Sequence, residues 1–172
     1  MTTGLLLAAG AGRRMGTPKA LVDGWLRRSV QVLVDGGCDH VRVVLGASAD
    51  EARILLDDLD VEVVVADDWV DGMGASLKGG LGEIDGDVLV NLVDLPDVGA
   101  DVVARVLASG AALARATYDG RPGHPVLIGA VHREALIETL HGDVGARAYL
   151  DAHDVLGVEC GDLATGRDVD SR

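Results

Sequence analysis

Short runs of apolar residues recur along this chain of 172 residues, and stretches with helical periodicity separate them. The apolar runs predict seven strands, at residues 5–9, 41–45, 61–65, 88–93, 111–117, 124–128 and 155–159. The stretches between them predict helices near residues 25–35, 49–57, 74–83, 99–109, 131–140 and 144–152. Such alternation is typical of a sheet that helices cover on both faces.

The fold class follows from this alternation. It predicts an α/β protein, a Rossmann-like doubly wound three-layer sandwich with right-handed crossovers and a mostly parallel sheet. The turn-rich joint at residues 118–123 is too short for a helix, so the two strands beside it are expected to pair antiparallel. The chain has no internal repeat, low-complexity tract or linker, so residues 1–172 are expected to form a single domain.

Composition and charge narrow the class of protein further. Hydrophobic residues make up 48% of the chain but Phe is absent, so the core has to consist of Val, Leu, Ile and Ala, which suits a parallel sheet. The net charge of −13 argues against nucleic acid and against an anionic membrane surface as partners. Cys38 and Cys160 form neither a disulfide framework nor a metal motif. Without a leader sequence or a long apolar run, the chain is expected to be soluble and cytoplasmic.

The segment LLLAAGAGRRMGTPKAL, residues 5–21, leads from the first strand into a cationic loop. Its three glycines allow tight turns that point backbone amides into one concavity, and such a nest binds phosphate oxygens. Arg14 and Lys19 can add positive charge, and Arg13 is a further candidate. A plain loop between a strand and a helix remains the alternative.

This loop matches neither of two common nucleotide-binding motifs. It is not a Walker A loop, because Lys19 follows Pro18 rather than a glycine. It is not a dinucleotide fingerprint, because the third glycine comes one residue late. The second strand also ends in Leu45-Gly46-Ala47, without the acidic residue that binds a ribose hydroxyl.

Candidate metal ligands and one histidine lie near the crevice where such sheets bind ligands. Asp94 follows the strand at 88–93, and a carboxylate together with triphosphate oxygens is a usual way to hold Mg²⁺. Asp168 and Asp170 face the same way if their segment is extended. The alternatives are an ordinary aspartate before a turn and an acidic solvated tail. His124 opens the sixth strand, where it either touches a substrate or packs as an ordinary histidine.

Several motifs, in the order in which they follow one another along the chain, resemble those of the MobA-like NTP transferases. The resemblance is greatest to the molybdenum cofactor cytidylyltransferase-like group. The opening loop is similar to that group's Leu-Ala-Ala-Gly, Arg-Met-Gly and Pro-Lys signature. Further similar elements are DDWVDGMGASLKGGL (67–81), NLVDLPDV (91–98), YDGRPGHPVLIG (118–129) and GDVGARAYL (142–150). The resemblance covers nearly the whole chain and implies the nucleotide-diphospho-sugar transferase type of α/β sandwich.

The resemblance also implies roles for individual residues. Catalytic roles fall on Arg14, Lys19 and Asp94, and metal binding falls on Asp94 and Asp170. If the chain is such a transferase, His124 is the candidate for contact with the acceptor. Nucleotide binding falls on two glycine-rich segments, at Leu7, Ala8, Ala9, Gly10, Ala11, Gly12, Gly72, Met73, Gly74 and Ser76.

The C-terminal end departs from the family pattern. Thr-Pro follows the metal-binding aspartate in the family, whereas Ser171 and Arg172 follow Asp170 here. A helix that pins this segment in the family therefore has no counterpart in the sequence. Asp170 as a second metal ligand and Asp170 in a frayed tail both stay open.

The implied activity is nucleotidyl transfer in molybdenum cofactor biosynthesis. A phosphate group of the acceptor attacks the α-phosphorus of a nucleoside triphosphate (NTP) and pyrophosphate leaves, with Mg²⁺ as cofactor. CTP is favoured over GTP, because the guanylyl branch has Leu-Ala-Gly-Gly where this chain has Leu7-Ala8-Ala9-Gly10. The implied acceptor is a molybdopterin-type cofactor. The alternatives are a nucleotide-dependent oxidoreductase of the same family and a non-catalytic nucleotide-binding module.

Overall fold

One seven-stranded sheet runs through the molecule in the computed structural model, which describes residues 1–170. Its strand order is β3-β2-β1-β4-β6-β5-β7. Strand β6 runs antiparallel to β4 and β5, and the other neighbouring strands are parallel. The strands are β1 Thr2–Ala8, β2 His40–Leu45, β3 Glu62–Val65, β4 Asp87–Leu92, β5 Leu113–Tyr118, β6 Arg121–Ile128 and β7 Leu156–Glu159. The predicted fold class, including its one antiparallel strand, is confirmed.

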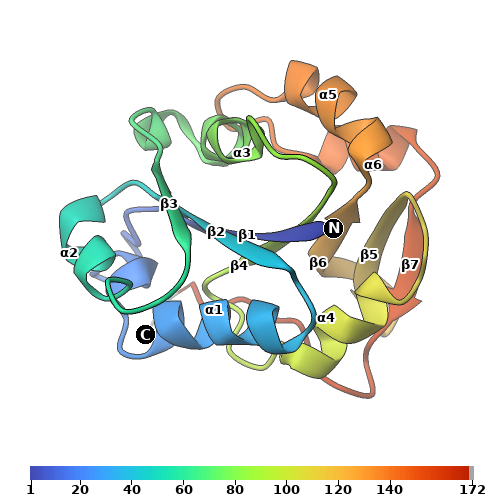
Figure 1. Cartoon of the computed structure of the whole chain (residues 1–172), viewed down its shortest axis with the longest axis horizontal. Helices are drawn as coiled ribbons and strands as arrows, with labels where there is room; N and C mark the ends of the chain where they lie inside the picture. Colours follow the sequence, from blue (N-terminus) through green and yellow to red (C-terminus); the bar gives the residue numbers. More distant parts are fainter. Residues whose placement is uncertain (171–172) are drawn as a thin grey trace.

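Helices cover both faces of this sheet and complete the three layers (Figure 1). One face carries α1 (Trp25–Asp35), α2 (Ala49–Ile54) and α4 (Ala100–Leu107). The other carries α3 (Met73–Leu81), α5 (Ala130–Thr139) and α6 (Arg147–Ala152). Two single 3₁₀ turns, η1 (Lys19–Leu21) and η2 (Trp69–Asp71), lie in loops. Within residues 1–170 no helix has the length and apolar character needed to cross a bilayer.

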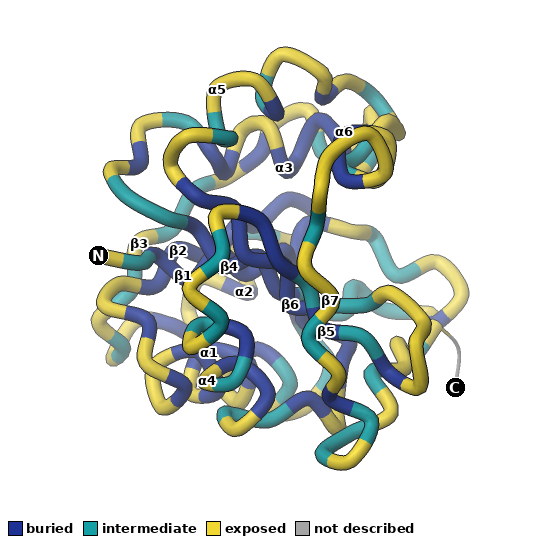
Figure 2. Tube along the Cα trace, turned by 90° about the vertical axis from the view of Figure 1, so that its right-hand side faces the viewer, coloured by how far each residue is buried: buried dark blue, intermediate teal, exposed yellow. Residues whose placement is uncertain are grey.

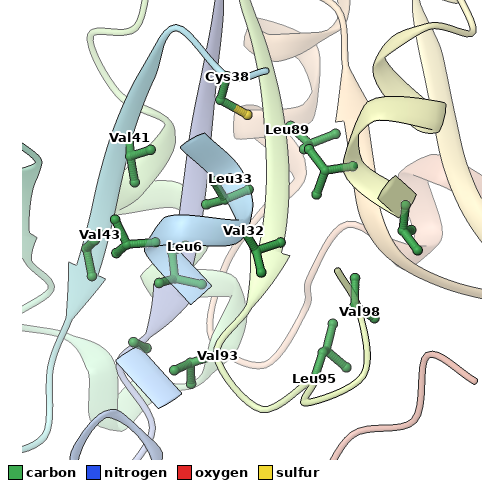
Figure 3. Packing of buried hydrophobic residues seen from close by; sticks show 14 of the residues in the cluster. Leu6, Val32, Leu33, Cys38, Val41, Val43, Leu89, Val93, Leu95 and Val98 are labelled. Atoms are coloured by element: carbon green, nitrogen blue, oxygen red, sulfur yellow. The ribbon is translucent and has the colours of Figure 1, made fainter. Parts of the chain in front are cut away.

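The core divides into two apolar clusters, one on each face of the sheet. Successive strand side chains point to opposite faces, so Leu6 packs against α1 and α4 while Leu5 and Leu7 pack under α3. Figure 3 shows the first cluster, in which Leu33 of α1 lies over the sheet near Leu6. The tube in Figure 2 is dark blue through the central strands, where both faces are covered. Val, Leu, Ile and Ala dominate both clusters, as the composition predicts.

The boundaries differ from prediction mainly at the β5–β6 joint. The joint reduces to a two-residue hairpin, so β6 begins at Arg121, three residues before the predicted start. Asp119 and Gly120 both have positive φ, 53° and 80°, which is the geometry of the type I′ turn that Asp-Gly favours. Strand β1 also begins early, because Thr3 pairs with His40 of β2. Helix α2 is shorter than predicted and ends at Ile54.

Helix α3 is fixed tightly against the sheet, and this fixes the position of its N-terminus. A Cβ atom on Gly80 would lie 2.6 Å from a methyl of Val44, so only glycine permits this approach. The guanidinium of Arg42, buried on β2, donates to the carbonyls of Gly80 (2.8 Å) and Gly82 (2.6 Å) and pairs with Glu62. A cation at these carbonyls stabilises the C-terminal end of the helix. The opposite end of α3 faces the candidate site.

Candidate functional site

The loop after β1 folds back on itself around Gly12. Gly12 has φ +64°, and a Cβ atom there would lie 1.9 Å from the carbonyl oxygen of Thr17, so the position requires glycine. Its carbonyl accepts hydrogen bonds from the amides of Met15 and Gly16, both at 3.0 Å. Within the described part of the chain, the amides of residues 10–14 have no hydrogen-bond acceptor. These free amides are compatible with the predicted nest for phosphate oxygens.

A first cavity of about 480 Å³ opens above this loop, at the carboxyl ends of β1 and β4. Nine of the ten predicted nucleotide-binding residues line it, together with Arg14, Lys19, Asp94 and Asp170. Gly74 does not. It is buried in α3, where a Cβ atom would lie 2.1 Å from the carbonyl oxygen of Val144. Gly74 therefore allows a close backbone contact behind the wall of the cavity.

The structure also brings residues to this cavity that were not predicted as binding residues. They are Trp69, Val70, Leu92 and Val93. Arg13, which the sequence offered as a further candidate for positive charge, also lines the cavity. Trp69 packs on Gly46 at the end of β2, where a Cβ atom would lie 2.5 Å from the Trp69 Cβ. Sequence alone offered a weak signal, because the chain has just two tryptophans and one of them precedes the Gly-Met-Gly segment. Arg13 and Arg14 both reach the cavity because residues 13–16 form a turn rather than a strand.

Three carboxylates meet at one end of the first cavity. Oxygen atoms of Asp94, Asp168 and Asp170 all lie within 4.8 Å of one another. The ammonium group of Lys19 lies between two of them, 2.5 Å from Asp94 Oδ2 and 2.9 Å from Asp170 Oδ1. Asp94 is buried, whereas Asp168 and Asp170 are exposed. We call these three residues the carboxylate cluster.

Ion pairing governs the protonation of this cluster. Partial burial works against the charge of Lys19, but its hydrogen bonds to Asp94 and Asp170 outweigh this and raise its pKa. The same ammonium group lowers the pKa of Asp170. Burial and the neighbouring charge of Asp170 raise the pKa of Asp168. The three carboxylates bring hard oxygen atoms close together, and the Lys19 ammonium group neutralises part of their charge. Such a set of oxygen atoms fits a magnesium or manganese ion.

The C-terminal segment, residues 164–170, is docked on the site over its described length. The amide of Val169 donates to the carbonyl oxygen of Asp94 at 3.0 Å. Asp97 accepts hydrogen bonds from the Thr165 amide (2.7 Å), the Thr165 hydroxyl (2.6 Å) and the Gly166 amide (3.3 Å). The described residues do not form the solvated tail that the sequence left open. The last two residues of the chain lie outside the described part.

A second cavity of about 500 Å³ adjoins the first, and the two share Leu7 and Met73 as walls. Its floor is largely apolar, with Leu77, Val90, Val126, Ile128 and Leu150. The polar groups along it include Arg115, which lies 3.9 Å from Asp151, and His124. The second cavity lies between the sheet and helices α3 and α6.

His124 lies near both the second cavity and the carboxylate cluster. Burial lowers the pKa of its imidazole to about 4; the charge of Asp94 opposes this and that of Arg115 adds to it. The imidazole is therefore neutral near pH 7. Its backbone carbonyl accepts a 2.6 Å hydrogen bond from the hydroxyl of Tyr118, which holds the start of β6 in place. His124 is thus largely buried and also lines a cavity, and its contact with a substrate stays a prediction.

Comparison with known proteins gives one family. The model of the MobA-like NTP transferase domain matches residues 4–156. A nicotine blue oxidoreductase of Paenarthrobacter nicotinovorans is 37% identical over 187 aligned positions, which cover 98% of this chain and 92% of the relative.

Solved structures agree with this match. A homologue of Mycobacterium tuberculosis Rv0371c from Mycobacterium sp. strain JC1 superposes with a TM-score of 0.85 and 31% identity, over 99% of this chain and 90% of that one. Rv0371c of M. tuberculosis H37Rv, in a complex with manganese, superposes with a TM-score of 0.79 and 25% identity, over 98% and 93%.

Proposed function

The chain belongs to the MobA-like NTP transferase family, and from that premise we propose that it transfers a nucleoside monophosphate from an NTP to an acceptor that carries a phosphate group. One observation carries the proposal. The first cavity joins a loop of open backbone amides and two arginines to a cluster of three carboxylates. A triphosphate with its metal needs both halves, because phosphate oxygens need donors and the ion needs oxygen ligands. We take residues 1–172 as one such domain, since all described strands join one sheet.

In the proposed reaction, groups of the opening loop hold the triphosphate. The amides of residues 10–14 and the guanidinium groups of Arg13 and Arg14 bind its oxygens, and Lys19 neutralises charge that develops on the departing pyrophosphate. An oxygen of the acceptor phosphate bonds to the α-phosphorus while the bond from that phosphorus to its bridging oxygen breaks. The products are pyrophosphate and a nucleotide joined to the acceptor through a diphosphate. Positioning and neutralisation suffice, so the chain needs no covalent nucleophile.

Asp94 and Asp170, with Asp168 beside them, are the proposed ligands of Mg²⁺. Bound there, the ion would supply neutralisation of the α-phosphate and the acceptor phosphate. The manganese complex of Rv0371c supports a divalent ion in this family. Lys19 has to move from the carboxylates toward the phosphates when the ion and the nucleotide bind, which its long side chain permits.

CTP is the proposed nucleotide, because Ala9 stands where the guanylyl branch of the family has a glycine. For the acceptor we propose a molybdopterin-type cofactor in the second cavity. The apolar floor of this cavity suits the face of a flat ring system, and Arg115, His124 and Asp143 in its lining can pair with polar groups at the edge of such a ring. His124 lines the second cavity, and the charge of Asp94 acts on its imidazole, so His124 is the proposed contact for the acceptor. The proposed location is the cytoplasm, and nucleic acid and membranes are not proposed as partners of a chain with charge −13.

Reduction of a ring compound by a nicotinamide nucleotide is the second candidate. The 37% identical relative is named an oxidoreductase, and the second cavity could hold such a ring. The end of β2 counts against it. Trp69 packs on Gly46 there, and the Leu45-Gly46-Ala47 segment provides no carboxylate for a ribose hydroxyl.

One incubation separates these activities. The protein is mixed with each NTP in turn, Mg²⁺ and molybdenum cofactor, and pyrophosphate release is followed beside NAD(P)H oxidation. We expect pyrophosphate release with CTP and a larger rise in melting temperature with CTP than with GTP. NAD(P)H oxidation without pyrophosphate release would replace the proposal by the second candidate. Binding of CTP with neither activity would leave a non-catalytic nucleotide-binding module.

A further inference from the structure

Asp97, in the loop between β4 and α4, has no place in the proposed reaction, yet its carboxylate accepts three hydrogen bonds from one distant turn. The donors are the amide and the hydroxyl of Thr165 and the amide of Gly166, at 2.7, 2.6 and 3.3 Å. The donors lie 68 and 69 positions further along the chain. Burial of Asp97 works against its charge, but these hydrogen bonds lower its pKa below the ordinary value.

The turn that Asp97 holds has a defined geometry. Gly166 has φ +67°, and a Cβ atom there would lie 2.1 Å from the ring of Tyr118, so the turn is pressed against an aromatic side chain of β5. The hydroxyl of Thr165 accepts a further hydrogen bond from the Arg167 amide at 3.3 Å. Two residues beyond Arg167, the Val169 amide reaches the carbonyl of Asp94 at 3.0 Å.

The loop of Asp97 is itself braced from the neighbouring helix. Arg28 of α1 donates to the carbonyls of Leu95 (3.3 Å) and Val98 (3.5 Å). The same braced loop therefore carries both Asp94 and Asp97. Asp94 is the first carboxylate of the cluster, and the Asp97 side chain holds the C-terminal segment that contains the other two carboxylates. The spacing between the ligands is set at the loop and not by the C-terminal segment alone.

We propose that Asp97 is a positioning residue, which holds the turn at Thr165 and Gly166 and thereby sets Asp168 and Asp170 beside Asp94. The inference rests on the proposed role of the carboxylate cluster in metal binding. Residues that orient metal ligands in this way typically change metal affinity by roughly 10–100-fold when they are replaced. A role in packing alone would lower stability without this effect on the metal.

The test measures metal affinity and docking of the segment separately. Mn²⁺ binding is titrated by electron paramagnetic resonance, and amide hydrogen exchange of residues 164–170 reports whether the segment stays docked. We expect Asp97→Ala to weaken Mn²⁺ binding roughly 10–100-fold and to speed exchange at Thr165, Gly166 and Val169. Asp97→Asn keeps an acceptor oxygen and the size of the side chain, so a smaller loss is expected.

Glu159→Gln is the matched control. The Glu159 carboxylate accepts amide hydrogen bonds from Asp119 (3.0 Å), Gly120 (2.9 Å) and Gly161 (2.7 Å), and it is not a member of the carboxylate cluster. The Glu159→Gln substitution should leave Mn²⁺ affinity unchanged. Because Asp97 acts through Asp168 and Asp170, adding Asp170→Asn to Asp97→Ala should cause little further loss.

The outcomes separate this inference from the proposed function. Unchanged Mn²⁺ affinity or unchanged exchange in Asp97→Ala would overturn the inference, and so would an equal loss in Glu159→Gln. If Asp94→Asn abolishes Mn²⁺ binding while Asp97→Ala leaves the affinity unchanged, the proposed metal site stands and the positioning role fails. If the variants behave as expected but no NTP yields pyrophosphate, the positioning role stands and the proposed function fails.

Discussion

Replacing Lys19 by methionine tests the arrangement of the carboxylate cluster most directly. The change removes the ammonium group but keeps most of the unbranched side chain, so the cluster loses its cation with little loss of packing. The bond to Asp94 is the important one, because the side chains of Lys19 and Asp94 are 19% and 11% exposed. The bond to Asp170, whose side chain is 51% exposed, is screened by solvent and contributes little.

The expected loss of stability follows from these two bonds. A protected charge-assisted hydrogen bond contributes about 1.5–3 kcal/mol, and the exposed one contributes up to about 1 kcal/mol. We therefore expect Lys19→Met to lower the free energy of unfolding by about 2–3 kcal/mol, or the melting temperature by roughly 5–10 °C in a domain of this size. The raised pKa of Lys19 means that its contribution is fully present below the ordinary lysine value and is lost only as the pH rises through the raised value. The difference from wild type should thus stay constant between about pH 7 and about pH 9.

A divalent ion should reverse the defect. Mn²⁺ or Mg²⁺ can take the place that the ammonium group leaves, whereas in the wild type it has to displace Lys19 first. Differential scanning fluorimetry with and without the ion should therefore show a larger metal-induced shift in Lys19→Met than in wild type. Lys78→Met, at the chain's one other lysine, is exposed on α3 and serves as the control. Equal stability of Lys19→Met and wild type, or equal metal-induced shifts, would refute the reasoning.

Three further predictions concern Asp94 and His124, which line the cavities, and Gly74, which lies behind a cavity wall. Asp94→Asn should abolish divalent-dependent turnover while circular dichroism shows an intact fold, because the amide keeps the size but not the charge; full activity at limiting Mg²⁺ would argue against the metal role. Gly74→Ala should destabilise by about 1–3 kcal/mol in urea titrations, since its Cβ atom would lie 2.1 Å from the Val144 carbonyl. Gly79→Ala in the same helix meets nothing within 4 Å and should be neutral or stabilising, so equal losses would contradict the contact. Because the pKa of His124 is lowered in the folded protein, this histidine takes up a proton at a higher pH in the unfolded chain than in the folded one. Wild-type stability should therefore fall by at most about 3 kcal/mol as the pH drops from about 6.5 to about 4. Urea midpoints of His124→Gln should lack this part of the slope, and identical slopes would show that His124 is not the group responsible.

The sequence predicted the elements well because their signals are local. Buried strands such as β4 read as continuous Val and Leu runs, and Asp-Gly marks its hairpin without reference to any other part of the chain. The exact start of β6 was missed because Arg121 and Pro122 are exposed and carry no apolar pattern. Their strand conformation depends on pairing with β5, which no local pattern reveals.

The site was predictable where one segment contains it and not where distant segments meet. The opening loop is contiguous, so its local pattern and the family resemblance together indicated its glycines and Arg14. The bonds of Lys19 to Asp94 and Asp170 join positions 75 and 151 apart, and the bonds from Thr165 to Asp97 span 68. Whether the C-terminal segment docks is decided by such long-range pairs, so the sequence left the role of Asp170 open.

The position of Lys19 has a consequence for the order in which ligands can enter the proposed site. While no ligand is present, the ammonium group acts as an internal counter-ion and lets three carboxylates stand together without a metal. A free divalent ion gains little by entering, because it must expel a cation that is already tethered at high effective concentration. A metal–triphosphate complex faces no such barrier, since its phosphates offer the displaced ammonium group a new partner. The protein would then bind the metal–triphosphate complex more tightly than the free ion.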